Sequence, residues 1–439
     1  MSCQLPFPSQ PVPRPRVWVA MGIAALLGAC ASINQDPVAQ PVIGAKTKGI
    51  LNIDGLQFKD SNGNGRLDPY EDWRLPVDER VSDLVARMGL EEKAGMMLIE
   101  TLNAGCGGTV SPTAVNFIDS QKMTRFILRN VVKGTGDKCD GSVPPGRSGN
   151  AVTPPQMAAF TNAIQAMAEA KPLGIPVQFK DNARNHYETD PRFGISAGAG
   201  AFTEFLKEAG IAAAVLGTGD MSPVKRLTEV MGQEWNAIGL RGMYGYMADL
   251  ATEPRWYRVQ ETFSEDADLN ARIMTALVEG LQGGPVNPRS AVGYVNSDTG
   301  IINARAWGLE GKTVPERVAA AVNGGTDILS GFSTNKTITD LVAANLISEA
   351  RVTEAAKRLV AEQFKLGLFE NPYVDASRAT GIIGSDAHRA TGFEVQKQSI
   401  VLLQNRDQAV GKTLPLKTGA RVSYPAKDTL YPFGFCLGF

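Results

Sequence analysis

The chain has 439 residues, of which 43% are hydrophobic, 20% charged and 7% aromatic, and its 44 Lys and Arg nearly balance 45 Asp and Glu, for a net charge of -1. This composition is typical of a globular protein with one large domain or two to three smaller ones. The near-neutral charge argues against nucleic-acid binding, which normally needs a basic face. Glycine (46) and proline (26) together stay well below the ~25–30% of low-complexity chains. The only histidines, His186 and His388, exclude a multi-histidine zinc site.

The N-terminus predicts an exported lipoprotein. The apolar run over residues 17–29 is shorter than the ~20 residues of a membrane span and is typical of a signal peptide. It ends in LGAC, which resembles a bacterial lipobox, in which Cys30 would be diacylated and become the first mature residue. The alternative is an ordinary signal peptide in which Cys30 falls there by chance. We expect a signal peptide over residues 1–29, lipidation of Cys30, and a bacterial protein that is periplasmic or anchored to the outer membrane by its lipid alone.

The remaining cysteines suggest one disulfide. In an exported protein, Cys106 and Cys139 can pair and close a glycine-rich loop. Cys3 would be removed with the signal peptide, and Cys436 would then be unpaired. Spacing alone leaves the connectivity open.

Residues 60–71, DSNGNGRLDPYE, match a calcium loop of the EF-hand type, which would follow a polar tether, so that residues 30–75 form tether and loop. Oxygen-bearing side chains recur at the liganding places, and Gly65 stands where the chain must turn sharply. The alternative is a solvated turn rich in Asp and Asn. The calcium ion would be structural, and no organic cofactor is expected. The expected ligands are Asp60, Asn62, Asn64, the backbone carbonyl of Arg66, Asp68 and Glu71.

Two amphipathic helices frame the middle of the chain. Asp78 is expected to cap the first, whose apolar face carries Val81, Leu84, Val85 and Met88. The second is expected to begin at Thr353 and to stop at Gly367.

Between these helices, short apolar runs alternate with helical segments, which predicts βα units, a parallel sheet and the α/β class. Three of the runs lead to an acidic residue: IPVQFK to Asp181, GMYGYMA to Asp249 and GYVNS to Asp298. In a (β/α) barrel the active site lies at the carboxyl ends of the strands, so these aspartates are candidate site residues. A helix N-cap in a loop explains each of them alone better, whereas the three together favour a functional site about as much as three caps.

Two segments, EPRWYRVQETFSED (residues 253–266) and GYVNSDTG (residues 293–300), point to one enzyme family. The first resembles the DPRWGR-x-x-E-x-F-x-E-D segment of glycoside hydrolase family 3, the β-glucosidase and exo-glucosidase family, and the second is similar to its nucleophile motif. MGLEEKAGMM and QFKLGLFENPY resemble the first and last parts of the barrel in that family. SIVLLQN with LPLK, and YPFGFCLGF, resemble the beginning and the end of its α/β-sandwich domain.

The resemblance implies a retaining glycoside hydrolase of the β-glucosidase type, which removes terminal β-linked glucose-like residues from oligosaccharides or β-glucosides. Asp298 would be the nucleophile. Asp181 stands where the family has the Asp that holds sugar hydroxyls, Arg258 would contact the same sugar, and Glu261 would support Arg258. A retaining enzyme also needs a second carboxyl ~5–5.5 Å from the nucleophile, which protonates the leaving oxygen.

Two blocks of the family pattern are missing. After PRWGR the family has a sugar-binding Lys-His pair and further strands, whereas residues 281–298 are too few for one βα unit of roughly 30 residues. Residues 399–439 are too few for a sandwich domain, which in many members supplies the acid/base Glu. We therefore expect an incomplete (β/α) TIM-type barrel over residues 76–375 and a truncated remnant of an α/β sandwich over residues 376–439.

No motif supplies the missing acid/base. His186, Glu188 and Asp190, in NHYETD, are candidate substitutes, although a hydrogen-bond network in a loop explains them better. The alternative to an active hydrolase is therefore a non-catalytic lipoprotein of the same fold with at most sugar binding. The sequence leaves the preferred sugar and the oligomeric state open.

Overall fold

The chain divides into two units, Met1–Ala39 and Gln40–Phe439, and the second unit is described here. The predicted signal peptide and Cys30 lie outside the residues that the structure describes. The computed structural model describes residues 39–142, 149–186, 199–243, 245–283, 295–297, 299–304, 308–403, 405, 414–416 and 418–419.

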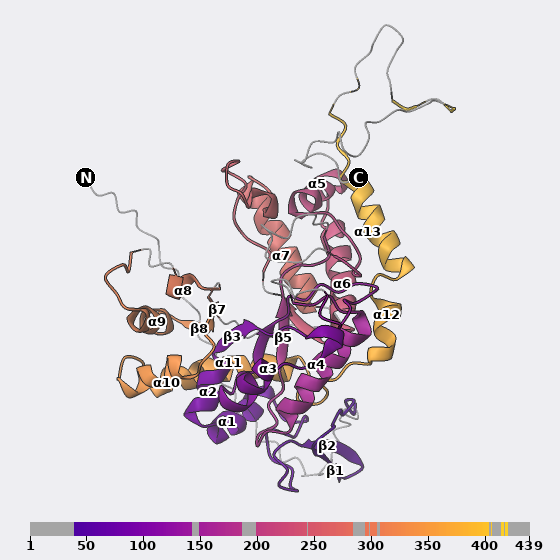
Figure 1. The fold of residues 1–439 in the computed structure, drawn as a ribbon. Helices are drawn as coiled ribbons and strands as arrows, with labels where there is room; N and C mark the ends of the chain where they lie inside the picture. The colour runs from indigo at the N-terminus through magenta and orange to yellow at the C-terminus, as the bar shows by residue number, and fades with distance from the viewer. Residues whose placement is uncertain are drawn as a thin grey trace, which may run out of the picture. The chain divides into compact units, whose positions relative to one another are not determined.

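A parallel sheet organises the second unit (Figure 1). Among the described residues it has six strands in the order β6-β5-β4-β3-β8-β7, and every neighbouring pair is parallel. The carboxyl ends of all six strands therefore meet at one edge, and the α/β class predicted from the sequence is confirmed. The strands are β3 Leu98–Thr101, β4 Arg125–Ile127, β5 Gln178–Asp181, β6 Leu240–Met243, β7 Val295–Asn296 and β8 Thr326–Ser330.

Helices connect the strands, as the alternation of the sequence predicts: α4 joins β4 to β5, α5 and α6 precede β6, and α9 precedes β8. A separate hairpin of β1 (Gly49–Ile53) and β2 (Leu56–Asp60) precedes the first helix. The helices are α1 Val77–Arg87, α2 Leu90–Met96, α3 Pro112–Val115, α4 Pro154–Glu169, α5 Glu208–Thr218, α6 Ser222–Asn236, α7 Ala267–Gly283, α8 Ile301–Ala304, α9 Val314–Asn323, α10 Lys336–Ala343, α11 Glu349–Lys365, α12 Ala379–Ile382 and α13 Asp386–Gln398, with shorter turns at η1 Cys106–Gly108, η2 Asn116–Ser120, η3 Val259–Glu261 and η4 Ala376–Arg378.

The two faces of β4 and β5 bury different chemistry. Phe126 and Phe179 face α4, where Phe160 lies 6.3 Å from Phe179 between ring centroids. Because side chains alternate along a strand, Arg125 and Lys180 point to the opposite face, where both form ion pairs with Glu362 of α11, at 3.5 and 3.9 Å. Burial lowers the pKa of Lys180 to about 8 despite this carboxylate. The sheet is therefore apolar towards α4 and charged towards α11.

Both predicted framing helices exist, but their starts differ from the prediction. α1 has Pro76 as its N-cap, and Asp78 lies in the first turn, where its charge favours the helix dipole. α11 begins four residues before Thr353, because the Ser348 hydroxyl accepts a hydrogen bond from a backbone N–H of the first turn. Its end agrees with the prediction: Gly367 has a φ of +67°, a left-handed conformation that glycine adopts easily.

The segment before α1 is folded rather than a free tether over residues 40–58. The Glu169 carboxylate, at the end of α4, accepts backbone N–H groups of residues 46–48 at 2.5–3.1 Å and the Tyr373 hydroxyl at 2.6 Å. These bonds outweigh the effect of burial, so the pKa of Glu169 is lowered. One buried carboxylate thus holds residues 46–48 and Tyr373 against the end of α4.

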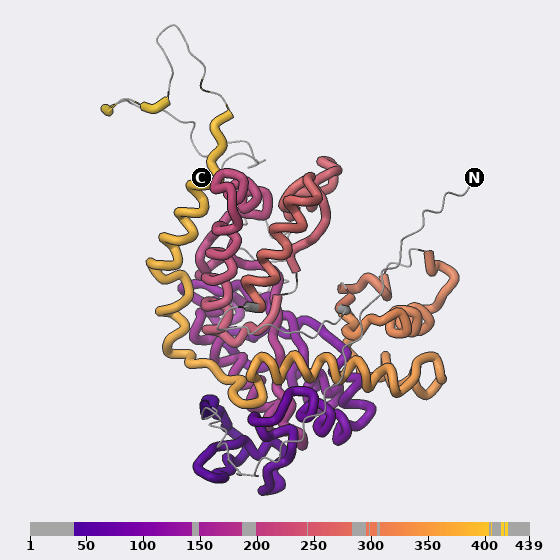
Figure 2. Tube along the Cα trace, turned by 180° about the vertical axis from the view of Figure 1, so that it is seen from behind, coloured from indigo at the N-terminus to yellow at the C-terminus, as the bar shows by residue number. Residues whose placement is uncertain are grey.

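The described part of residues 376–419 contains helices and no strand. α13 lies along α5 and α6 (Figure 2). The apolar run Ile400–Leu403, resembling the start of a sandwich domain, follows α13 with each side chain 61–85% exposed. A strand needs a neighbouring strand to pair its backbone, and the described residues offer none beside this run. Within the described part of the chain, no helix is both long and apolar enough to span a membrane.

Candidate active site

Asp181 is the last residue of β5 and is only 1% exposed. Its carboxylate forms an ion pair with Arg184 and accepts the backbone N–H of Asn182 at 2.8 Å. Arg184 also donates to the backbone carbonyls of Leu128 and Asn130, at 3.1 and 2.5 Å. The pair therefore ties the end of β5 to the chain that leaves β4.

The electrostatic setting of Asp181 is unusual for an aspartate. Burial raises its pKa to about 6, although Arg184, the N–H of Asn182 and Arg129 all act in the opposite direction. Desolvation penalises the charged form of a carboxyl group. Asp181 consequently titrates near neutral pH, a property that is common in functional sites.

A second cation at this edge was not predicted from the sequence. Arg129, just beyond β4, donates from Nε to Thr101 Oγ1 and from Nη1 to Asn182 Oδ1, both at 3.0 Å. Its backbone N–H donates to Asn103 Oδ1 at 2.9 Å. The sequence does carry a signal for this residue, since the apolar run FIL is followed directly by Arg-Asn at positions 129–130, just as the run before Asp181 is followed by an acid.

Arg258 and Glu261 contact each other. The Arg258 guanidinium donates to Glu261 Oε2 at 2.7 Å, and the pair is mostly buried beside η3. Among the described residues, no hydrogen bond or ion pair joins either of them to Asp181. Asp249, in contrast, is exposed in a loop, because β6 ends at Met243. The prediction that a strand leads directly to Asp249 is therefore wrong.

The expected nucleophile, Asp298, lies outside the described residues. Its neighbours are held at the carboxyl end of β7: Ser297 Oγ accepts the backbone N–H of Ser330 at 2.9 Å, and the hydroxyls of Thr299 and Ser330 are 2.8 Å apart. Ser330 is the last residue of β8. Residues 297 and 299 thus lie at the same edge of the sheet as Asp181.

His186 is buried and neutral rather than poised as an acid. Burial, together with Lys207 and Arg184, lowers the pKa of its imidazole to about 3. It therefore carries no extra proton at neutral pH. The other two candidate substitutes, Glu188 and Asp190, lie outside the described residues.

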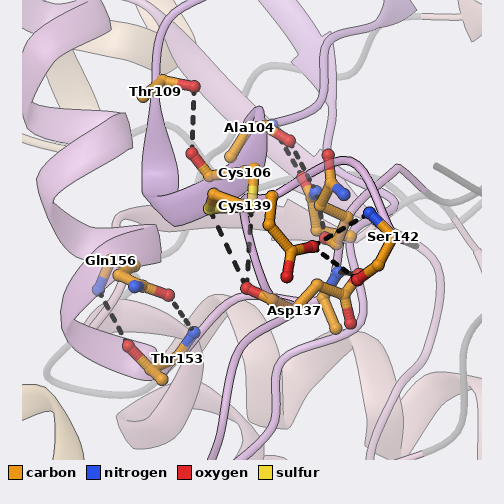
Figure 3. Close-up of a disulfide and its surroundings, with 12 residues drawn as sticks. Ala104, Cys106, Thr109, Asp137, Cys139, Ser142, Thr153 and Gln156 are labelled. Atoms are coloured by element: carbon orange, nitrogen blue, oxygen red, sulfur yellow. Dashed lines mark hydrogen bonds between the residues drawn. A yellow bond between two sulfur atoms is a disulfide. The ribbon is translucent and has the colours of Figure 1, made fainter. Parts of the chain in front are cut away.

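A disulfide fastens the loops beside this edge (Figure 3). Cys106, after β3, is bonded to Cys139, after β4, with 5.5 Å between their Cα atoms. The Asn130 side chain pairs with both backbone groups of Ala104, at 2.8 and 2.9 Å, and so connects the same two loops. The disulfide is the pairing that the sequence had left open, and it closes the loop that contains β4 and Arg129.

The predicted calcium loop makes its own hydrogen bonds. Gly65 has a φ of +74°, and the Asp60 carboxylate accepts the backbone N–H groups of residues 64 and 65 at 2.9–3.0 Å. Glu71 accepts two backbone N–H groups, while Asp68 accepts two asparagine amides and Arg87. Across the described residues, no three His, Cys, Asp or Glu side chains gather as a metal-binding group.

This chain has a parallel sheet with polar side chains at its carboxyl edge. It therefore falls in the class of α/β proteins, which commonly bind ligands at that edge. Comparison with known proteins is more specific. Residues 141–291 match the family described as "Glycosyl hydrolase family 3 N terminal domain". This match covers about a third of the chain and supports the resemblance to glycoside hydrolase family 3.

Two curated relatives are similar over most of the chain. The "Periplasmic beta-glucosidase/beta-xylosidase" of Dickeya chrysanthemi is 28% identical, with 88% of this chain and 72% of that protein covered. The "Probable beta-glucosidase C" of Aspergillus oryzae is 26% identical, with 81% and 67% covered.

Solved structures of the family show the same fold. A β-glucosidase from Erythrobacter marinus superposes with a TM-score of 0.57 at 20% identity, covering 77% of this chain and 52% of that one. A family 3 β-N-acetylglucosaminidase from a Paenibacillus species gives 0.56 at 15% identity, covering 73% and 70%. The chain thus spans about half the length of the first of these structures.

Proposed function

We propose that the protein is an exported, retaining glycoside hydrolase that releases terminal β-linked glucose or xylose residues. The observation that carries the proposal is Asp181, a buried carboxyl at the end of a parallel strand, beside two arginines and at the same sheet edge as residues 297 and 299. The names of the relatives, β-glucosidase and β-xylosidase, support this substrate class.

The proposed chemistry uses two carboxyl groups. The Asp298 carboxylate attacks the anomeric carbon while the glycosidic C–O bond breaks and a carboxylic acid gives its proton to the leaving oxygen. Water then gives one proton back to that second carboxylate and attacks the same carbon of the glycosyl-enzyme, so that the bond to Asp298 breaks and Asp298 is released as a carboxylate. Asp181 accepts hydrogen bonds from sugar hydroxyls, and Arg184 holds it in place. Arg258, supported by Glu261, contacts the same sugar.

This chemistry requires the sheet to curl into an arc of a (β/α) barrel, which we include in the proposal. β5 and β7 are four strand positions apart, which in a flat sheet is roughly 19 Å at ~4.8 Å per strand. One sugar ring cannot contact both strand ends at that distance. The strand order supports a barrel, since β8, the last strand, pairs with β3, the first. Residues after 376 would be the remnant of the sandwich domain.

Export and calcium complete the proposal. The printed name of the Dickeya relative, which is periplasmic, supports export, and Cys30 would carry the lipid. The loop at residues 60–71 would hold a structural Ca²⁺. Support comes from Gly65 in the conformation that the sharp turn needs, and from Asp60 and Glu71, whose buried carboxylates are already oriented by backbone N–H groups.

The test is hydrolysis of aryl β-glucosides and aryl β-xylosides by the purified protein, without its signal peptide. We expect measurable turnover, which Asp298→Ala abolishes and Asp249→Asn, a change in an exposed loop, leaves intact. A fluorinated glycoside that traps the intermediate should add one glycosyl mass to the wild type and none to Asp298→Ala. A folded protein that hydrolyses none of these substrates would contradict the proposal.

A further inference from the structure

We propose that Arg129 contacts the substrate directly and that, with Asp181, it forms a donor–acceptor pair for two hydroxyl groups of the sugar at the end of the chain being cleaved. The inference rests on the proposed function and adds to it a residue outside the motifs that resemble the family. Its guanidinium lies across the carboxyl ends of three neighbouring strands, β3, β4 and β5.

Arg129 differs in exposure from the two structural arginines beside it, which also form ion pairs with Glu362 and Asp181. Arg125 and Arg184 are fully buried and donate to backbone carbonyls, Arg125 to that of Leu359 at 2.6 Å. Such bonds fasten one element to another. Arg129 is only half-buried, and the bonds described for it go to a hydroxyl and an amide oxygen of side chains that themselves lie at the edge.

Two side-chain acceptors, at the ends of the two strands that flank β4, fix the plane of the guanidinium. Thr101 Oγ1 holds Nε from the β3 side, and Asn182 Oδ1 holds Nη1 from the β5 side. A guanidinium has five N–H donors in a rigid fork. Fixing it in advance reduces the entropy that substrate binding would otherwise cost.

Arg129 also acts on Asp181. It is close enough to oppose, together with Arg184, the rise in the pKa of the Asp181 carboxyl. A hydroxyl group both accepts and donates hydrogen bonds. Adjacent hydroxyls of one sugar therefore suit an arginine that donates beside a carboxylate that accepts. Because Asp181 would be ionised in this role, Arg129 serves the pair both as a ligand and as a neighbouring positive charge.

The test compares Arg129→Gln and Arg129→Lys with Arg255→Gln, a change in an arginine whose side chain is 88% exposed. We expect kcat/KM for an aryl β-glucoside to fall about 10- to 100-fold in Arg129→Gln, the loss typical of a hydrogen bond to a charged group. Arg129→Lys keeps the charge but not the fork, so its loss should be smaller. Arg255→Gln should match the wild type.

A second readout separates substrate contact from a purely structural role. In Arg129→Gln the acidic limb of the pH profile of kcat/KM should move to higher pH, because a positive charge beside Asp181 is lost. Glucose binding, measured by calorimetry, should weaken in parallel. Thr101→Val removes only the acceptor of Nε and provides the same comparison if Arg129→Gln does not fold.

The outcomes separate the two proposals. Turnover by the wild type with selective losses in the Arg129 variants supports the inference. Turnover and glucose binding within twofold of the wild type in both Arg129 variants would overturn the inference and leave the proposed function intact. A wild-type protein that neither hydrolyses aryl glycosides nor binds glucose would overturn the proposed function, and the inference with it.

Discussion

Replacing Glu234 by glutamine should destabilise the protein more than any exposed substitution on the same helix. Glu234, on α6, is completely buried, and its carboxylate accepts the Asn185 amide at 2.7 Å and both the backbone N–H and the hydroxyl of Thr203, at 3.0 and 2.6 Å. It also accepts the backbone N–H of Gly384 at 2.8 Å and lies 3.1 Å from Nδ1 of His388. One side chain thus connects the loop after β5 to α12 and α13.

The expected loss in the free energy of unfolding follows from counting the hydrogen-bond acceptors of the side chain at position 234. A glutamine offers one oxygen in place of two. If that oxygen stays towards Gly384 and His388, the new NH₂ group faces the N–H of Thr203 and the amide of Asn185. The Asn185 amide cannot turn freely, because its oxygen accepts Trp235 Nε1 at 3.0 Å. At least one buried donor loses its acceptor, which costs about 1–3 kcal/mol.

The assay is thermal unfolding followed by circular dichroism or calorimetry. With about 2.1 cal/mol/K of unfolding entropy per residue over the roughly 340 described residues, this loss lowers the melting temperature by about 1–4 °C. Glu229→Gln, on the exposed side of the same helix, is the control and should change stability by less than ~0.5 kcal/mol. Limited proteolysis should cut residues 376–398 faster in Glu234→Gln. Equal melting temperatures for the wild type and Glu234→Gln would refute the network reasoning.

Two further predictions concern pH and calcium. Because burial raises the pKa of Asp181 to about 6, its ionised fraction, and with it kcat/KM, should rise about tenfold between pH 5 and pH 7, a rise that Asp181→Asn removes. The pKa of Asp181 in the folded protein lies above its ordinary value of 3.8. The stability that protonated Asp181 contributes is therefore complete below about pH 4 and is lost as the pH rises through 6. Melting temperatures of the wild type and Asp181→Asn that change with pH in the same way would contradict this. Calcium at about 100 times its dissociation constant should stabilise the fold by about 2.7 kcal/mol. Asp60→Asn should remove this gain, and melting temperatures that are equal with calcium and with chelator would argue against the calcium loop.

Much of the architecture could be predicted from local patterns in the sequence. The end of the run IPVQFK lies in β5, and Asp181, which follows the run, is the last residue of that strand. The alternation of apolar runs and helices corresponds to a parallel sheet. The run before Asp249 was misleading, because its apolar residues pack in a loop. Tyr246 lies 5.3 Å from Phe263 between ring centroids, and Met243 already ends the strand. Apolar content indicates burial, and burial alone does not distinguish a strand from a packed loop.

The site could be predicted only in part, for a different reason. An acidic residue after an apolar run is visible in one stretch of sequence, so Asp181 was found. The role of Arg129 depends on register: it meets Thr101 and Asn182 because β3, β4 and β5 pair in parallel with Ile127 beside Thr101 on one side and Lys180 on the other. No local pattern specifies which residues of three separate strands lie side by side.

The proposed function assigns sugar binding and bond cleavage to different strands of the described edge. Asp181, Arg184 and Arg129 are held by bonds within three neighbouring strands, so this part of the site is complete without any contribution from β7. Attack by Asp298 has a further requirement, since the ends of β5 and β7 must approach across four strand positions. If the proposed function holds, curvature of the sheet affects kcat, while β3–β5 together with Arg258 determine affinity for the sugar. Substitutions in β3–β5 should accordingly change KM and glucose binding together, whereas substitutions that loosen Ser330, which holds residues 297 and 299, should lower kcat and leave glucose binding unchanged.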